Sequence, residues 1–217
     1  MFLEVRNLSK TIKGVTVLDN INLGFDLGRI YGLRGKNGSG KTMLLKAIAG
    51  LIRPTSGEVA VNGKVLGKDI SFPPSIGILI ENPSFIGKYT GYKNLKLLAD
   101  IQGRIGDTQI NAALEAVGLE QANKKPYRKY SLGMKQRLGV ACAVMEDPDI
   151  ILLDEPTNAL DPEGTEKVVA LINEHQERGA LILVACHDAE ELESLTDEIF
   201  LMAEGRLVKD ERYGRKS

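Results

Sequence analysis

Short apolar runs alternate with stretches of helical periodicity along most of this chain. Several runs are almost wholly apolar, which is typical of strands buried on both faces of a parallel sheet. These runs lie at 29–34, 76–80, 150–153 and 180–186. Helical spacing of apolar residues follows at 42–51, 162–178 and 188–196. Because strands alternate with helices, we expect an α/β fold with a mainly parallel sheet in three layers.

Other segments alternate more loosely and contain turn residues, which indicates antiparallel strands. Residues 2–6 and 15–26 have this pattern, and 58–65 are expected to form a hairpin that turns at Asn62-Gly63. A last pair of strands is expected around the turn Glu204-Gly205. These hairpins predict an antiparallel addition to the parallel sheet.

Helical patterns replace strands between residues 83 and 147. Helices are expected at 91–104, 107–117 and 133–146. Asp107 or Thr108 suits the N-cap of the second helix, and Gly118 suits its C-terminal end. We therefore predict a single domain over residues 1–217 in which 83–147 form an inserted helical lobe.

The residues between an expected strand and an expected helix match the phosphate-binding pattern G-x-x-x-x-G-K-[ST]. They are Gly35, Lys36, Asn37, Gly38, Ser39, Gly40, Lys41 and Thr42. A glycine loop before a helix N-terminus aims backbone N–H groups at phosphate oxygens. Lys41 is expected to reach the β- and γ-phosphates and Thr42 to offer its hydroxyl to Mg²⁺, with Met43 next to them. The alternative is a glycine-rich turn that starts an ordinary helix.

Acidic residues follow the apolar run at 150–153, where ligands bind in open α/β sheets. Asp154 is the candidate ligand of Mg²⁺, and Glu155 is the candidate catalytic group that polarises the attacking water. His187 ends the strand at 180–186, at a similar depth in the same sheet, and can sense a γ-phosphate there. A lone histidine is more often structural, so this role depends on its placement beside the acids.

Composition limits the classes of protein that fit. The chain has 28 basic and 29 acidic residues, a net charge of −1, which gives no support to a nucleic-acid partner. Cys142 and Cys186 lie in apolar runs and are expected to be buried, reduced thiols. We find no signal peptide and no apolar stretch long enough to span a bilayer, so we expect a cytoplasmic chain. Any membrane-spanning part would belong to another polypeptide.

Five motifs occur in an order and spacing that resemble the ABC-type ATPases. They are the phosphate loop 35–42, the signature Ser131-Leu-Gly-Met-Lys-Gln136, the acidic strand 150–155, the segment Asn158-Ala-Leu-Asp161 and His187. The resemblance covers essentially the whole chain. It implies a RecA-like core with an antiparallel β subdomain over 1–82 and 148–217, and a helical signature subdomain over 83–147. It also implies ATP and Mg²⁺ as cofactors, and a head-to-tail dimer in which each ATP lies between one phosphate loop and the other subunit's signature.

Three positions depart from the pattern of that family. The signature differs from the usual L-S-G-G-Q, with Tyr130 at its leading Leu, and Lys135 adds a positive charge near the expected phosphate. Glu81 replaces the usual Gln that contacts the metal and the attacking water, so metal affinity is expected to change. The aromatic residue expected near position 12 to stack on adenine is absent, and Ile12 and Val17 offer only apolar contact, so GTP is expected to compete.

Glu81 together with the segment 130–137 resembles the branch that includes bacitracin-resistance and lantibiotic self-protection exporters. The resemblance implies an ATPase on the inner face of the membrane that powers a separate transmembrane permease subunit. Residues 82–92 would line the groove that receives a helix of that permease, or would form an ordinary packed loop. An importer ATPase and a soluble non-transport ABC ATPase are the alternatives. Against the soluble protein, only about 110 residues separate the two halves of the site, too few for long coiled coils.

Overall fold

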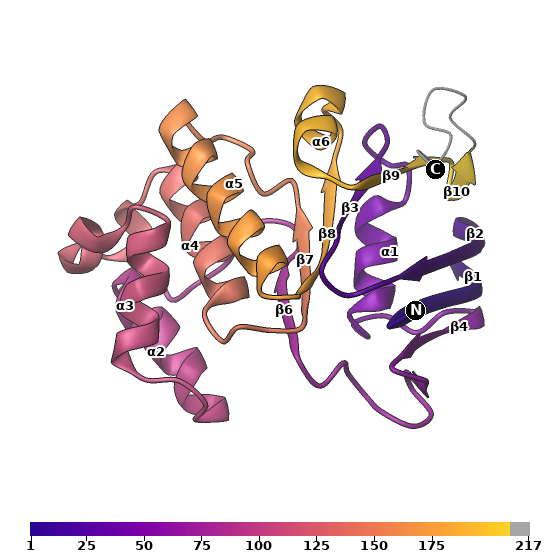
Figure 1. Cartoon of the computed structure of the whole chain (residues 1–217), viewed down its shortest axis with the longest axis horizontal. Helices are drawn as coiled ribbons and strands as arrows, with labels where there is room; N and C mark the ends of the chain where they lie inside the picture. Colours follow the sequence, from indigo (N-terminus) through magenta and orange to yellow (C-terminus); the bar gives the residue numbers. More distant parts are fainter. Residues whose placement is uncertain (209–217) are drawn as a thin grey trace.

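The computed structural model describes residues 1–208 and contains two β-sheets with helices between and beside them (Figure 1). The larger sheet has the order β10-β9-β3-β8-β7-β6, and all its neighbouring pairs are parallel except β10 with β9. Its strands are β3 (Ile30–Arg34), β6 (Ile76–Leu79), β7 (Ile150–Asp154), β8 (Leu181–Cys186), β9 (Glu198–Ala203) and β10 (Arg206–Val208). The predicted parallel sheet is confirmed, and the predicted turn Glu204-Gly205 joins β9 to β10.

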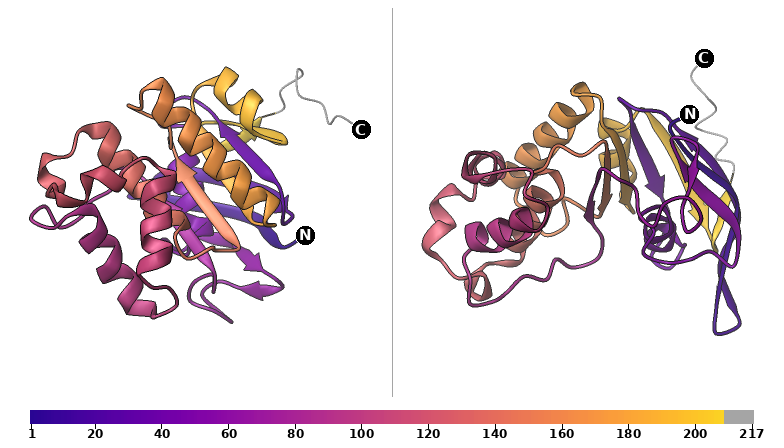
Figure 2. Two further views of the ribbon diagram at one scale, coloured as in Figure 1. Left: turned by 60° about the vertical axis from the view of Figure 1, so that its left-hand side comes forward. Right: turned by 90° about the horizontal axis from the view of Figure 1, so that it is seen from below.

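Alternate residues of the larger sheet enter two different hydrophobic cores. On one face, Leu33 and Leu183 join Leu44 of α1 (Lys41–Ile48) and the antiparallel sheet. On the other face, Ile182 joins a core with Val168 of α5 (Pro162–Glu177), to which α6 (Ala189–Leu195) also contributes. Helices therefore cover both faces of the sheet, which is the predicted three-layer arrangement (Figure 2).

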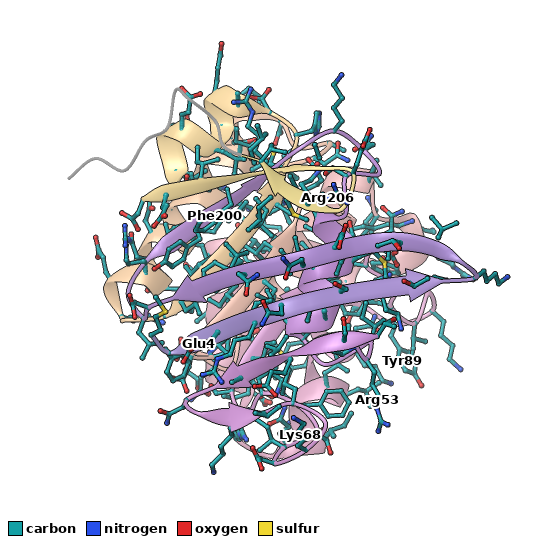
Figure 3. The ribbon with its side chains drawn as sticks, turned by 90° about the vertical axis from the view of Figure 1, so that its right-hand side faces the viewer. Glu4, Arg53, Lys68, Tyr89, Phe200 and Arg206 are labelled. Carbon is teal, nitrogen blue, oxygen red and sulfur yellow. The ribbon has the colours of Figure 1, made fainter. Side chains whose placement is uncertain are left out.

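The smaller sheet is antiparallel and packs on α1, with the order β2-β1-β4-β5. Its strands are β1 (Leu3–Ile12), β2 (Val15–Phe25), β4 (Ser56–Val61) and β5 (Lys64–Val65). Asn62 and Gly63 both have positive φ, as a two-residue hairpin turn requires. The Arg206 Nε atom donates to Asp19 Oδ2 over 2.8 Å and so ties β10 to β2. Arg206 is labelled in Figure 3.

The first strand is longer than the predicted 2–6 because irregular pairings let it continue through polar positions. Asn7 and Asn20 have φ near +50°, and the register of β1 with β2 shifts between Val5 and Leu8. Side chains replace the missing ladder bonds there. The Asn7 N–H donates to Asn22 Oδ1 and the Asn20 N–H to Ser9 Oγ.

The helical lobe contains α2 (Gly91–Gln102), α3 (Asp107–Ala116) and α4 (Leu132–Val144), as predicted. Short 3₁₀ helices over Glu120–Lys124 and Tyr127–Lys129 join α3 to α4. The predicted N-cap of α3, Asp107 or Thr108, was wrong: Gly106 occupies that position, and its N–H donates to Gln109 Oε1 over 3.1 Å.

Helix α4 packs against the larger sheet as well as against the lobe. At Gly77 in β6, a Cβ atom would lie 1.6 Å from the carbonyl oxygen of Ala143, so only glycine fits. The division of the chain at 147/148 stays a prediction, because a single core joins the helices of the lobe to one face of the larger sheet. Cys142 and Cys186 are free, with Cys186 fully buried and Cys142 partly so. Within residues 1–208, no helix combines the length and the apolarity needed to cross a membrane.

Candidate nucleotide site

The phosphate loop joins the carboxyl end of β3 to the N-terminus of α1, as the sequence predicted. Gly40 has a φ of 105°, and a Cβ atom there would lie 3.0 Å from the carbonyl oxygen of Val17. At Gly35 a Cβ would lie 2.4 Å from the carbonyl oxygen of Met202. Gly40 is therefore required by its left-handed backbone, and Gly35 by its close packing against Met202. The buried Lys41 Nζ donates to Gly35 O over 2.6 Å, which holds the ammonium group inside the loop.

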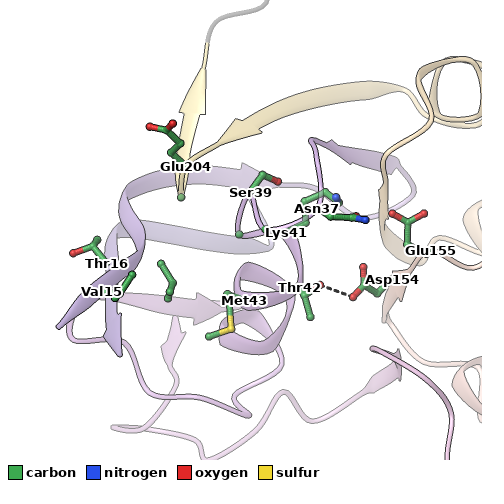
Figure 4. Close-up of a pocket in the computed structure, with 14 residues that line it drawn as sticks. Val15, Thr16, Asn37, Ser39, Lys41, Thr42, Met43, Asp154, Glu155 and Glu204 are labelled. Carbon is green, nitrogen blue, oxygen red and sulfur yellow. Dashed lines mark hydrogen bonds between the residues drawn. The ribbon is translucent and has the colours of Figure 1, made fainter. Parts of the chain in front are cut away.

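A cavity of about 470 Å³ opens over the loop (Figure 4). This volume lies in the range of small-molecule sites. Of the predicted ATP-binding residues, Asn37 to Thr42 and the following Met43 line it, whereas Gly35 and Lys36 do not. Asp154 and Glu155 line it as well. The loop and the acidic strand therefore meet at one cavity, although about 110 residues separate them.

Two β-turns contribute cavity residues that sequence reasoning missed. Val15 and Thr16 come from the β1–β2 hairpin, and Glu204 and Gly205 come from the β9–β10 turn. The Gly205 N–H donates to Ser39 O over 2.9 Å, which fixes the second turn to the phosphate loop. A sequence signal for these contacts is lacking, because only the packing of the two sheets brings the turns together.

Thr42 and Asp154 meet directly, and their geometry suits a divalent cation. The Thr42 hydroxyl donates to Asp154 Oδ2 over 2.7 Å. Burial raises the pKa of the Asp154 carboxyl, while the bond from Thr42 and the charge of Lys41 oppose that rise. A desolvated carboxylate beside a hydroxyl is a donor set of hard oxygens, which Mg²⁺ prefers. The residues present therefore fit the metal that the sequence predicted.

Glu155 and His187 lie side by side because β7 and β8 are neighbouring parallel strands. His187 Nδ1 lies 3.0 Å from Glu155 Oε1 and 2.9 Å from Oε2. Glu155 has a φ of 50°, and its backbone is fixed by a bond from its N–H to Ala185 O. The Gln136 Nε2 atom donates to Glu155 O over 2.8 Å, which joins the signature helix α4 to the acidic strand. The structure thus brings the predicted catalytic glutamate and histidine together.

The signature segment begins α4. Ser131 Oγ accepts a bond from the Met134 N–H and caps the helix. The Lys135 ammonium lies 5.4 Å from the centre of the Tyr127 ring, so its charge rests on that aromatic face. At Gly133 a Cβ would lie 2.8 Å from the carbonyl oxygen of Ala159, which keeps the segment 158–161 against the signature.

The three sequence departures have distinct surroundings. Glu81 has a φ of 61° and lies two residues after the end of β6, and its Oε1 atom lies 2.6 Å from Lys46 Nζ. Val17 lines the cavity together with Val15, whereas Ile12 is absent from the lining. Among the residues that line the cavity in the described part of the chain, none is aromatic. The base of a nucleotide would therefore meet aliphatic side chains.

The loop, the paired acids and the histidine on this fold define a phosphate-loop NTPase. The family model described as ABC transporter matches residues 18–158. The chain is 49% identical over 210 residues to an uncharacterized ABC transporter ATP-binding protein of Bacillus subtilis, covering 97% of this chain and 96% of that protein. The chain therefore belongs to the ATP-binding proteins of ABC transporters, an ATPase family.

Two further relatives and a solved structure support this assignment. The bacitracin transport ATP-binding protein BcrA of Enterococcus faecalis is 40% identical, covering 96% of this chain and 68% of that protein. The lantibiotic transport ATP-binding protein SrtF of Streptococcus pyogenes is 34% identical, covering 97% and 91%. A dimeric post-hydrolysis structure of the ATP-binding cassette MJ0796 with ADP and Pi matches with a TM-score of 0.87 and 26% identity, covering 96% and 97%. The predicted fold class and the resemblance to bacitracin and lantibiotic transport proteins are confirmed.

Proposed function

We propose that this chain hydrolyses ATP in a Mg²⁺-dependent reaction that drives export through a separate membrane subunit. The observation that carries the proposal is the meeting of Thr42, Asp154 and Glu155 at the phosphate-loop cavity. Export is favoured over import because the bacitracin and lantibiotic transport proteins are similar over nearly the whole chain. The chain would then lie on the cytoplasmic face of the membrane, bound to its partner.

Each part of the site has a distinct task in this proposal. The loop N–H groups and Lys41 bind the phosphates, and Lys41 exchanges its bond with Gly35 O for phosphate oxygens. Thr42 and Asp154 would hold Mg²⁺, which neutralises charge on the β- and γ-phosphates. Glu155 orients water and accepts its proton, while Gln136 fixes the Glu155 backbone. His187 would leave Glu155 for the γ-phosphate.

The site is proposed to be completed by a second copy of the chain. Ser131 caps an exposed start of α4, whose N-terminus would face the γ-phosphate of the partner subunit. The dimeric structure of a similar cassette supports this arrangement. The ATPase rate per molecule should therefore fall on dilution into the monomeric range. A rate that stays constant in protein shown to be monomeric would contradict the dimer.

The segment 82–92 is the proposed contact with the permease. Its Ile86 side chain is 47% exposed, and Asn94 fixes the loop by bonds to the Ile86 N–H and carbonyl oxygen. An exposed apolar side chain on a loop of fixed conformation can pack against a helix of the permease. No nucleic-acid partner is proposed, in keeping with the balanced charge.

Glu155→Gln tests the proposal, because it should bind ATP yet hydrolyse it at least about a hundredfold more slowly. Brisk turnover by this variant would refute the role of Glu155. The tagged chain should also co-purify from membranes with a polypeptide that has several transmembrane helices. Ile86→Glu should lose that polypeptide, whereas Ile101→Glu, at an exposed position of α2, should keep it. Equal recovery with both variants would contradict the contact through 82–92.

A further inference from the structure

Three side chains of different chemistry converge at the carboxyl ends of β7 and β8. Glu155 offers a carboxylate, Cys186 a thiol and His187 a ring nitrogen, and these ligand atoms lie within 4.8 Å of one another. We propose that Glu155, Cys186 and His187 form an inhibitory binding site for a thiophilic divalent cation, with Zn²⁺ as the best fit. The inhibition, but not the binding, rests on the proposed role of Glu155 in hydrolysis.

The existing geometry is close to that of a zinc site. Tetrahedral zinc with sulfur, nitrogen and oxygen ligands at about 2.0–2.3 Å sets those ligand atoms roughly 3.3–3.8 Å apart. His187 Nδ1 and Glu155 Oε2 are already 2.9 Å apart. The nitrogen and oxygen would therefore move apart by about 0.4 Å and the Cys186 sulfur would move closer by at most about 1 Å to complete three ligands.

The surroundings leave a route by which the ion can reach the three side chains. The His187 side chain is 62% exposed and Glu155 lines the nucleotide cavity, so the ion can enter from solvent and water can fill the fourth position. Burial raises the pKa of the Cys186 thiol to about 12, and the bond that its sulfur accepts from the Asp188 N–H over 3.3 Å opposes that rise, so the cation itself must displace the thiol proton. On binding, the thiol proton leaves to solvent and the sulfur–metal bond forms in its place.

The donor set distinguishes this cation from the one expected at Thr42 and Asp154. Thiolate and imidazole favour Zn²⁺ or Co²⁺, whereas Mg²⁺ prefers a full shell of oxygens. Zinc on Glu155 occupies the oxygens that would accept the proton of water, and zinc on His187 holds the ring away from the γ-phosphate. A bound zinc ion would therefore stop hydrolysis without displacing the nucleotide.

Cobalt titration of the full chain tests the binding without any measurement of activity. Wild-type protein should bind one Co²⁺ per chain with a thiolate charge-transfer absorption in the near ultraviolet, and Zn²⁺ should remove that absorption by competition. Cys186→Ser should lose the absorption and bind Zn²⁺ at least about tenfold more weakly. Cys142→Ser, the matched control in α4, should keep both. Absence of the absorption in wild type, or its persistence in Cys186→Ser, would overturn the proposal, and the wild-type result decides even if a variant fails to fold.

Inhibition is measured separately, at saturating Mg²⁺ and ATP. Zn²⁺ should inhibit wild type and Cys142→Ser alike, and a zinc-selective chelator should restore the rate. The concentration for half-inhibition should rise at least about tenfold in Cys186→Ser, while its rate without zinc stays unchanged. Equal inhibition of Cys186→Ser would overturn the inhibitory role. If Co²⁺ binds through Cys186 but no inhibition follows, the proposed role of Glu155 fails and the metal site stands.

Discussion

The Lys46 ammonium lies 2.6 Å from the Glu81 carboxylate, so helix α1 holds the segment that follows β6. Lys46 is one turn beyond Thr42, and its side chain is 23% exposed against 63% for Glu81. A pair with this much exposure contributes about 0–1 kcal/mol to stability. The Lys46–Glu81 pair therefore matters because it positions the Glu81 carboxylate, and it adds little to the free energy of unfolding.

Glu81 and Lys46 should affect the Mg²⁺ dependence in opposite directions. Glu81→Gln removes an anion beside Asp154, the proposed Mg²⁺ ligand, and should raise the Mg²⁺ concentration for half-maximal ATPase. Lys46→Met releases the Glu81 carboxylate from its partner and should lower that concentration. Both variants should keep the wild-type melting temperature and nucleotide affinity. Superimposable Mg²⁺ titrations of the three proteins would remove Glu81 from the mechanism.

The ionised Asp154 side chain should destabilise the folded protein when no nucleotide is bound. Its pKa is raised by burial, so the ionised form is less favourable in the folded chain than in the unfolded chain at neutral pH. Asp154→Asn removes that charge and should raise the melting temperature, by about 2–4 °C for each kcal/mol gained. The advantage should shrink as the pH falls toward the Asp154 pKa, because the wild-type carboxyl then becomes neutral.

The same variant should lose the function that the charge serves. Mg²⁺ with ATP should stabilise wild type in a thermal melt but stabilise Asp154→Asn much less, and ATPase activity should be abolished. The Thr42 hydroxyl can still donate to the amide oxygen, so misfolding of the loop is not expected. If the variant without nucleotide melts at a lower temperature than wild type, the Asp154 charge does not destabilise the folded chain.

His175 should make the protein less stable in mild acid. The side chain is 4% exposed. Its burial lowers the pKa of His175 below the usual 6.5, and the positive charge of Arg178 lowers it further. As the pH falls through 6.5 the unfolded chain takes up a proton before the folded chain does, so the free energy of unfolding decreases. His175→Gln should flatten the melting temperature between pH 7.5 and 5.5, taken as roughly one unit either side of 6.5.

The matched control for this prediction is His187→Gln, which removes the only other histidine of the chain. It should keep the steep pH dependence that His175→Gln loses. An unchanged slope in His175→Gln would assign the acid sensitivity to other groups.

Sequence reasoning predicted the parts of the site that lie within one local element. Lys41 and Thr42 close a contiguous eight-residue pattern, and Asp154 and Glu155 follow directly on the apolar run 150–153. Contacts made by packing were missed, as with Glu204 in the cavity and Lys46 on Glu81. Neither contact has a periodicity or a fixed spacing, because each joins elements that are remote in the chain.

The aliphatic wall of the cavity should make nucleotide selection weak. Val15 lies at the tip of the β1–β2 hairpin, 63% exposed, and it lines the cavity beside Thr16 and Val17 (Figure 4). Aliphatic contact does not distinguish adenine from guanine by hydrogen bonds, so the KM values for ATP and GTP should lie within a few fold of each other. A strong preference for ATP in the wild type would show that another group recognises the base.

Val15→Tyr should supply the aromatic surface that the cavity lacks. Stacking contributes about 0.5–1.5 kcal/mol, so the KM for ATP should fall about two- to tenfold while kcat stays the same. The exposure of Val15 leaves room for the ring without repacking of the core. Leu27→Tyr, at an exposed position that does not line the cavity, is the control and should leave KM unchanged. If Val15→Tyr and Leu27→Tyr have the same KM, the base does not bind against the hairpin.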